Sequence, residues 1–143
     1  MLAFLQRFFP TKKFPAPVLT QLQVEGIIVL EDGVGGSITY RDFRAPGRYS
    51  GWRRVGMKAS VVLTRVRLMA MNHSAVGGSS PIIDVPLTDP RIRKLTASEK
   101  KKGVLSIEFD VAIFHNDWSG TIEYRFRTPQ AQQLTGKLHE LIG

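Results

Sequence analysis

The stretch from Val104 to Phe114 alternates between apolar and other side chains, the pattern of a β-strand with one buried face. Its apolar positions are Leu105, Ile107, Phe109, Val111 and Ile113. After a turn at residues 116–120 the alternation resumes, with Ile122, Tyr124 and Phe126 on one side and Thr121, Glu123, Arg125 and Arg127 on the other. The two runs predict an antiparallel hairpin that covers a hydrophobic core.

An amphipathic helix is predicted directly after this hairpin. Thr128 is a favourable N-cap residue, and Pro129 is favourable at the first helical position. Apolar residues then recur at helical spacing: Ala131, Leu134, Leu138, Leu141 and Ile142. Because 143 residues are the length of one domain, we expect this helix to close a single core.

The first half of the chain predicts further strands. Gly26 to Glu31 reads as a strand, and the tract from Asp32 to Gly36 reads as the hairpin turn before a returning strand at Ser37 to Phe43. A phosphate-binding glycine loop is the competing interpretation of that tract. It is disfavoured because no Lys-Ser/Thr pair follows at Walker spacing and no helical pattern succeeds it.

Residues 44–56 hold Pro46 and three glycines, so they are predicted to form an irregular, exposed connection. The apolar runs Ala59 to Leu63 and Leu68 to Asn72 form either a tight hairpin or one long strand. Residues 72–80 predict a mobile loop before a strand at residues 82–87.

The positive charge is concentrated in one segment. The chain carries a formal net charge of +8 from 20 bases and 12 acids. Between residues 41 and 67 there are eight bases and one acid, Asp42, which gives +7, while the remainder holds 12 bases and 11 acids. Seven of the eight are arginines, whose planar forks suit phosphate or carboxylate. An anionic partner is one interpretation, and solvated charges that tune solubility are the other.

The N-terminal segment is apolar before it is basic, the reverse of a secretory signal. Residues 2–9 predict a short amphipathic helix, which docks on its own domain, on a second subunit or on a membrane surface. Its apolar residues are Leu2, Phe4, Leu5, Phe8 and Phe9. We assign residues 1–17 to this segment and a proline-containing connector, and residues 18–143 to the compact domain.

No recognisable catalytic or metal-binding pattern is present. The chain has no cysteine, which excludes disulfides and thiolate sites and fits a reducing cytoplasm. His73, His115 and His139 lack metal-ligand spacing. Glu108 and Asp110 are predicted to pair across the hairpin with Arg125 and Arg127. The sequence therefore predicts a non-catalytic protein without a cofactor or metal.

Several runs resemble pleckstrin-homology-like (PH-like) domains in their expected order. SVVLTRVRLMAMN, residues 60–72, resembles the "apolar strand, Thr, basic residue, Arg-Leu, apolar strand" signature of GRAM and bacterial PH-like domains. IIDVPLTDPRIRKL resembles the following strand, and GVLSIEFD, GTIEYRF and PQAQQLTGKLHELI complete the pattern. The resemblance covers about residues 18–142 and implies a mainly β fold: an antiparallel, strongly bent barrel of about seven strands plugged by the last helix.

Two features depart from the resemblance. The basic pattern of phosphoinositide-specific PH domains is not matched cleanly, and the last helix lacks the tryptophan common in eukaryotic members. Headgroup specificity therefore does not transfer. The family's loop site would nevertheless correspond to a basic set beside one rim of the barrel. Its members are Arg44, Arg48, Arg53, Arg54 and Lys58.

The leading functional expectation is a non-catalytic binding module that docks on anionic membrane phospholipid or an acidic protein through this set, peripherally on the inner face of the membrane. The first alternative is a protein-interaction or self-assembly domain, including a homo-oligomer, that uses the N-terminal apolar residues. Nucleic-acid binding is the third, because Tyr49 and Trp52 lie among the arginines, although no known nucleic-acid-binding signature accompanies them.

Overall fold

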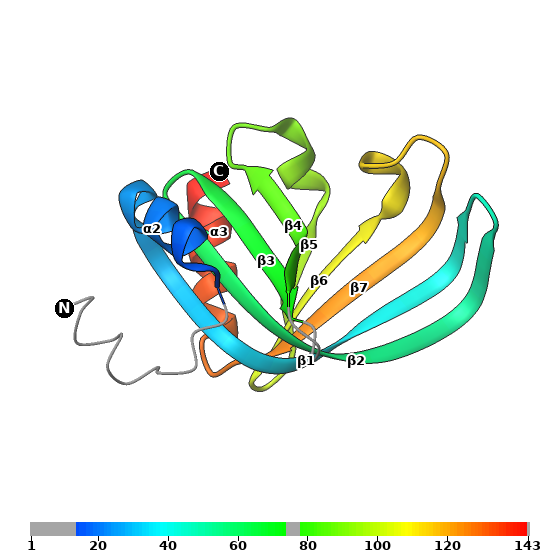
Figure 1. Ribbon diagram of the computed structural model, residues 1–143, viewed down its shortest axis with the longest axis horizontal. Coiled ribbons are helices and arrows are strands. Elements are labelled where there is room, and N and C mark those ends of the chain that lie inside the picture. The colour runs from blue at the N-terminus through cyan, green and yellow to red at the C-terminus, as the bar shows by residue number, and fades with distance from the viewer. Residues whose placement is uncertain (1–13, 74–77, 143) are drawn as a thin grey trace.

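The computed structural model describes residues 14–73 and 78–142. These residues form one seven-stranded antiparallel sheet with two α-helices (Figure 1). In chain order the elements are α2 (Ala16–Glu25), β1 (Ile27–Ala45), β2 (Arg48–Thr64), β3 (Arg67–His73), β4 (Ser79–Pro86), the 3-10 helix η1 (Pro90–Lys94), β5 (Thr96–Lys101), β6 (Val104–Asp110), the 3-10 helix η2 (Val111–Ile113), β7 (Ser119–Arg127) and α3 (Ala131–Ile142).

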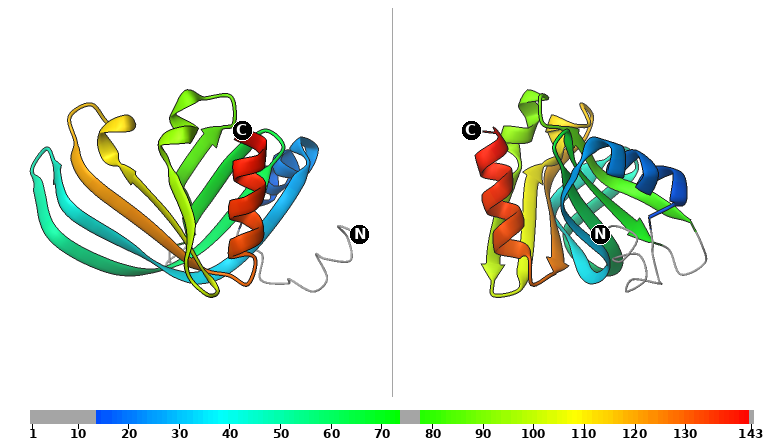
Figure 2. Two further views of the ribbon diagram at one scale, coloured as in Figure 1. Left: turned by 180° about the vertical axis from the view of Figure 1, so that it is seen from behind. Right: turned by 90° about the vertical axis from the view of Figure 1, so that its left-hand side faces the viewer.

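The strands lie in the order β4-β3-β2-β1-β7-β6-β5, and the sheet is strongly curved (Figure 1). α3 packs against β5 and β6, while α2 lies on the other side of the sheet (Figure 2, right). β4 and β5 end the strand order, and no backbone pairing joins them in the described part of the chain. The predicted antiparallel, mostly β fold with a C-terminal helix is confirmed, but the sheet is open where a closed barrel was expected.

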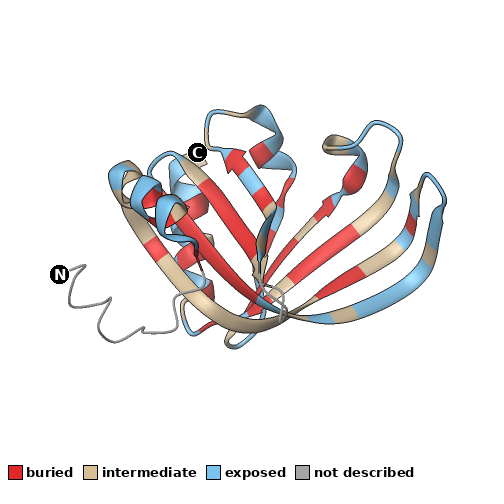
Figure 3. Cartoon of the chain, viewed as in Figure 1, coloured by how far each residue is buried: buried red, intermediate tan, exposed pale blue. Residues whose placement is uncertain are grey.

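Two hydrophobic clusters hold these layers together (Figure 3). The larger lies between the sheet and α3 and includes Val61, Phe126 and Leu134. The smaller packs Leu22 of α2 against Val62. Because successive side chains of a strand point to opposite faces, the neighbours Val61 and Val62 enter different clusters. Among the described residues no helix is both long and apolar enough to span a membrane.

The predicted C-terminal hairpin is confirmed as β6 and β7, which pair in antiparallel register. Leu105, Ile107 and Phe126 are fully buried, as the alternation indicates. The first strand ends earlier than predicted, because residues 111–113 form η2. The Asp110 side chain accepts a hydrogen bond from Ala112 N–H and so caps this turn of 3-10 helix. A short apolar run cannot distinguish a strand from such a turn.

The glycine tract does not form the predicted turn. β1 runs without interruption through residues 32–36 and pairs with β2 on both sides of them. One irregularity in the register falls between Glu31 and Val34, where Gly33 has a φ of 78°. This is the geometry of a β-bulge, which uses glycine to place one extra residue in a strand. Glycines that were interpreted as a reversal of the chain therefore bend a long strand.

Residues 44–56 are not the predicted irregular connection. They form the end of β1, a two-residue turn and the first half of β2. Pro46 followed by Gly47 with a φ of 74° is the arrangement of a type II turn. The later glycines, Gly51 and Gly56, lie within β2 rather than in a loop. The prediction failed because glycine and arginine in an exposed strand resemble a loop in composition.

The two alternatives for residues 59–72 resolve into a hairpin, because β2 and β3 pair from Leu63 with Leu68 to Lys58 with His73. The predicted mobile loop falls mainly on residues 74–77, outside the described residues. The strand predicted at residues 82–87 begins earlier, at Ser79. β5 had no counterpart among the predicted strands, since its sequence, TASEKK, is polar.

The N-terminal boundary of the compact region differs from the one assigned at residue 18. That boundary falls inside α2, a helix that was not predicted and that starts after Pro15. Phe14 is 3% exposed and packs in the smaller cluster, so the packed region begins at least four residues earlier. Proline in the first turn of a helix is well tolerated, and Pro17 occupies such a place. The helix predicted for residues 2–9 lies outside the described residues.

The predicted C-terminal helix is confirmed as α3. Its stripe buries Ala131, Leu134 and Leu138, while Leu141, expected in the same stripe, is 42% exposed. The helix begins at Ala131, two residues later than predicted, so Thr128 caps the turn that leads into the helix: its Oγ1 accepts a hydrogen bond from Gln130 N–H at 3.0 Å. The same hydroxyl donates to Glu31 Oε1 of β1 at 2.7 Å.

We predict that Thr128→Ala lowers the free energy of unfolding by about 1 to 2 kcal/mol, because it removes both hydrogen bonds of a buried hydroxyl. Urea unfolding followed by circular dichroism measures the change. Thr135→Ala is the matched control: among the described residues its hydroxyl bonds only to the Ala131 carbonyl within α3, and alanine is the better helix former. Equal stability of the two variants would contradict the capping role.

Candidate functional site

The five predicted binding residues lie together on one hairpin, which we call the basic arm and define as residues 44–58. Arg44 lies near the end of β1, and the other four lie on β2. The arm projects at one end of the sheet (Figure 1), and its β2 strand is largely exposed (Figure 3). All five side chains, Arg44, Arg48, Arg53, Arg54 and Lys58, belong to exposed residues. The site is thus an exposed hairpin at the edge of the sheet, whose β1 strand also pairs with β7, instead of the expected loop beside a barrel rim.

Two exposed aromatic rings accompany the cations on the arm. Tyr49 is 61% exposed and Trp52 is 62% exposed. The Arg44 guanidinium lies over the Tyr49 ring at 4.7 Å from its centroid, and that of Arg54 lies over the Trp52 ring at 5.5 Å. Such contacts hold a guanidinium by its face, so its N–H groups stay available for an anion.

The arm presents cations on both of its faces. β2 shows no register shift against β1 between Arg48 and Ala59, so its side chains alternate regularly there. Arg54 and Lys58 therefore point to the same face of the sheet as Val62, which is the face that α2 packs against. Arg53 points to the opposite face, on the side of Val61. The bases of β2 do not form one flat patch, but lie on both faces of the sheet along the same edge strand.

The other bases of the charged segment are used differently. Arg41 donates to Glu108 at 2.9 Å and to Glu123 at 2.7 Å. Arg65 and Arg67 lie around the β2–β3 turn, at the far end of β2 from the arm. By contrast, none of the five arm bases has an ion pair within residues 14–73 and 78–142; the Arg54 guanidinium donates only to the Thr39 hydroxyl, at 3.1 Å. No carboxylate of the described residues therefore neutralises the positive charge of the arm.

Glu123 of β7 is a fully buried carboxylate that the sequence pattern placed on a solvent-facing side. Arg125 donates to it at 3.0 Å, Ser106 at 2.6 Å and Arg41 at 2.7 Å. Burial alone would raise the pKa of Glu123, but these hydrogen bonds outweigh it and lower the pKa to about 2. The carboxylate is therefore a fixed negative charge that anchors two guanidinium groups.

The predicted pairing of Glu108 and Asp110 with Arg125 and Arg127 is wrong. The register places Glu108 opposite Glu123 and Asp110 opposite Thr121. Two glutamates directly opposite each other repel. Here Arg41, on β1 at the other side of β7, reaches across both of them.

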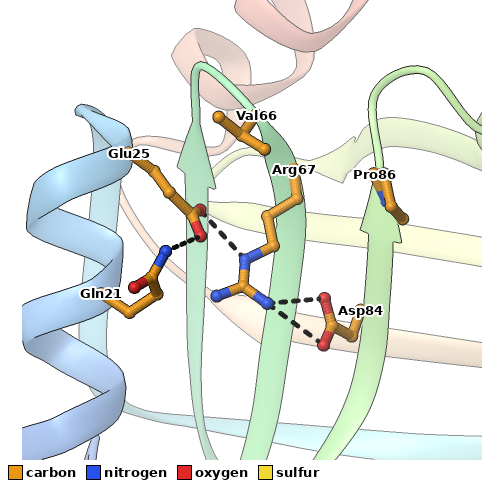
Figure 4. Close-up of a pocket in the computed structure, with 6 residues that line it drawn as sticks. All are labelled: Gln21, Glu25, Val66, Arg67, Asp84 and Pro86. Carbon is orange, nitrogen blue, oxygen red and sulfur yellow. Dashed lines mark hydrogen bonds and ion pairs between the residues drawn. The ribbon is translucent and has the colours of Figure 1, made fainter.

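A shallow, open pocket lies between α2, the β2–β3 turn and β4 (Figure 4). It is lined by Gln21, Glu25, Val66, Arg67, Asp84 and Pro86. The Arg67 guanidinium donates to Glu25 at 3.0 Å and to Asp84 at 3.2 Å. Burial would raise the pKa of Glu25, but hydrogen bonds from Arg67, Gln21 and Thr64 lower it. With two carboxylates and one guanidinium the pocket is net negative, so it does not suit an anion.

A chain of hydrogen bonds links the bulge of β1 to β4. The Ser60 hydroxyl donates to Asp32 at 2.6 Å, accepts from Gly33 N–H at 2.9 Å and lies 2.7 Å from His73 Nε2. His73 Nδ1 lies 2.6 Å from the Ser79 hydroxyl. A serine beside a histidine is the geometry of an activated nucleophile, but Ser60 has no exposed surface with which to meet a substrate. These hydrogen bonds connect β1, β2, β3 and β4.

The remaining histidines and acidic residues do not gather. Within the described residues no group of three or more His, Asp or Glu side chains could hold a metal ion. His115 stacks on Trp118 at a centroid distance of 3.8 Å, and His139 lies in the last turn of α3. The site that sequence reasoning missed is the buried Glu123 cluster, and the only signal for it was a glutamate in a strand of alternating pattern.

A scan of the sequence against protein-family models and a search of curated proteins found no match to this chain.

Proposed function

We propose that this protein is a non-catalytic PH-like binding module that associates peripherally with anionic membrane phospholipid through the basic arm. The observation that carries the proposal is the arm itself. It holds five exposed bases without carboxylate partners in the described structure, and it adds two exposed aromatic rings. Cations near a membrane surface contribute about 1 kcal/mol each toward binding anionic lipid, and Trp and Tyr favour the headgroup level.

The architecture supports the PH-like part of the proposal. PH-like domains were expected to combine a strongly bent antiparallel sheet with one closing C-terminal helix. The curved seven-stranded sheet and the packing of α3 against β5 and β6 agree with that expectation. Beyond this general agreement, we propose that the chain is a member of the GRAM or bacterial PH-like group and that its curved, open sheet corresponds to the barrel of that group.

The dimensions of the arm indicate how it would lie. Arg48 and Lys58 are ten residues apart on one strand, a span of roughly 30 Å. The headgroup layer of one leaflet is only about 5 to 8 Å thick, so the arm cannot enter it end-on for its whole length. Lying along the membrane on its β2 side, the arm would bring the cations of both faces to the headgroups. The division of Arg53 and Arg54 between the two faces is compatible with this orientation.

Flotation with vesicles of mixed neutral and anionic phospholipid tests the proposal. We expect salt-sensitive binding to anionic vesicles and none to neutral vesicles. Arg53→Glu with Arg54→Glu should weaken the binding at least about thirtyfold, because two contributions of about 1 kcal/mol are lost and repulsion is added.

Arg93→Glu with Lys94→Glu is the matched control for flotation. These two exposed neighbours lie in η1, away from the arm, and their substitution changes the net charge equally. The control should bind almost as the unchanged protein does. Salt-insensitive binding, or an equal loss in both double variants, would overturn the proposal.

A second candidate is single-stranded nucleic acid, favoured by the exposed rings of Tyr49 and Trp52 among arginines, since bases stack on such rings. A shift assay with a short single-stranded oligonucleotide at two salt concentrations discriminates it. Trp52→Ala should weaken oligonucleotide binding by about 1 to 3 kcal/mol if stacking contributes.

Self-assembly through Leu2, Phe4, Leu5, Phe8 and Phe9 stays a prediction, because these residues lie outside the described part of the structure. Analytical ultracentrifugation of the full chain and of a chain beginning at Phe14 tests it. Phe14 is kept because it is buried in the smaller cluster. The same monomeric mass for both chains would exclude self-assembly by this segment.

A further inference from the structure

One edge of the basic arm lacks a partner strand. β3 pairs with β2 only from Lys58 to Leu63. Over residues 48–57, β2 has β1 on one side and no strand of the described structure on the other (Figure 1). This free edge is ten residues long, whereas an average strand has about five to six residues. It is a template on which another extended chain can pair.

The hairpin geometry identifies the backbone groups at this edge. In an antiparallel pair, directly opposed residues alternate between exchanging hydrogen bonds and facing away from the partner strand. Ala45 and Arg48 flank the two-residue turn and form the first bonded pair. Counting from there, Tyr49, Gly51, Arg53 and Val55 direct their N–H and C=O groups to the free edge.

The edge has few of the features that prevent strand addition. Proteins protect edges with prolines, bulges and charges. From Arg48 to Met57 there is no proline, and the register with β1 shows no bulge. Gly51, in the middle of this stretch, has an exposed backbone without a side chain. The remaining protection is charge, and all of it on β2 is positive.

The single sign of that charge selects the occupant. A second copy pairing edge to edge would bring like charges within about 5 Å, the spacing of adjacent strands, which is unfavourable. The chain's own N-terminal segment contains Arg7, Lys12 and Lys13 and no acid, so it is not complementary either. A segment with alternating acidic residues would pair its carboxylates with the bases of the arm.

We propose that the free edge of β2 binds an extended, acidic segment of a partner protein as an additional antiparallel or parallel strand. This inference shares the basic arm with the proposed membrane association, but it depends on backbone groups of the edge and not on lipid headgroups. Backbone pairing supplies affinity in such strand addition, and side chains supply specificity.

The test uses the full chain and a synthetic peptide of about ten residues in which Glu alternates with Thr, a residue that favours strands. A peptide with Lys in place of Glu is the reference. We expect the acidic peptide alone to bind, with amide hydrogen exchange slowed by about tenfold or more at Tyr49, Gly51, Arg53 and Val55. The amides of Ser50 and Trp52 already bond to β1 and should change little.

Position 51 offers a matched pair of variants. Gly51→Pro removes one edge N–H and leaves every charge in place, while Gly51→Ala keeps the N–H and adds a methyl group in ordinary contact with the Tyr49 hydroxyl, at 3.4 Å. We expect Gly51→Pro to weaken peptide binding by about tenfold or more and Gly51→Ala by about twofold at most. Vesicle flotation of both variants should equal that of the unchanged protein, because headgroups bind side chains.

Several results would overturn the inference. They are the absence of acidic-peptide binding at millimolar concentration, binding without slower exchange at the four edge amides, and equal affinities of the two Gly51 variants. If Gly51→Pro fails to fold, the hydrogen exchange of the four edge amides in the unchanged protein, with and without the acidic peptide, still tests the inference. Loss of peptide addition by Gly51→Pro with vesicle flotation intact would separate the two proposals, whereas the arginine double variant should weaken both kinds of binding because it reverses the charge of the arm.

Discussion

Gly36→Ala is expected to destabilise the fold by about 3 kcal/mol or more, a large effect for a single methyl group. Gly36 lies in β1 where that strand pairs with Phe126 of β7. A Cβ atom at position 36 would overlap the backbone carbonyl oxygen of Arg125. Because that oxygen belongs to a strand paired on both sides, the contact can be relieved only by moving β7 away from β1. Urea unfolding followed by tryptophan fluorescence measures the loss.

The neighbouring glycine provides the control for this prediction. A Cβ atom at position 35 would lie 3.7 Å from Arg127 Nη1, an ordinary contact with the end of a flexible side chain. Gly35→Ala should therefore change the free energy of unfolding by less than about 1 kcal/mol. If the two alanine variants are equally stable, the close approach of β1 and β7 at Gly36 is not as described.

Glu123→Gln is expected to cost about 3 kcal/mol at neutral pH and to flatten the acid side of the stability profile. The substitution keeps the size of the side chain, but it leaves the guanidinium groups of Arg41 and Arg125 facing an uncharged amide. Removing one partner of a buried ion pair is costly because the remaining charges lose their compensation.

The pH dependence follows from the lowered pKa of Glu123. Its pKa is about 2 in the folded state, against 4.5 for an unperturbed glutamate, so between these values the unfolded chain binds more protons. Folding stability is then complete above pH 4.5 and falls as the pH drops toward 2. At 1.36 kcal/mol per pH unit, the gap between 4.5 and about 2 corresponds to about 3 kcal/mol.

Equilibrium unfolding from pH 2 to pH 7 checks both parts of this prediction. Glu108→Gln is the control, since Glu108 is partly exposed and has Arg41 as its one ion-pair partner in the described structure. It should cost less than about 1 kcal/mol. A Glu123→Gln variant that retains the acid dependence of the unchanged protein would show that other carboxylates cause it.

The elements that sequence reasoning predicted correctly are those whose periodicity extends over many residues. The alternation through Leu105 and Ile107 and the helical spacing of Leu134 and Leu138 each report one buried face, and both predictions are confirmed. Local composition was less informative. Glycine is typical of turns, so Gly33 and Gly51 were interpreted as turn or loop residues. Both lie inside long strands, because pairing with the neighbouring strand, and not the residue type alone, determines the local structure.

The charge count found the segment that carries the arm, but not its form. Residues 44–56 were expected to be an irregular connection, and only the register with β1 shows that the side chains of the arm alternate between two faces. The buried state of Glu123 was also outside the reach of sequence reasoning. It depends on Arg41, which is 82 residues away in the chain and reaches the carboxylate only after β1 and β7 have paired.

The placement of β1 between β2 and β7 has a consequence during translation. β1 is the sole link between the β4-β3-β2 half and the β7-β6-β5 half in the described sheet. Its contacts with β7 join Arg44 to Ser119 and Gly36 to Phe126, positions 75 and 90 residues apart. At about 5 to 20 residues per second, a ribosome takes several seconds to supply that partner. In that interval the nascent chain carries β1 with one side unpaired, which makes it a target for chaperones.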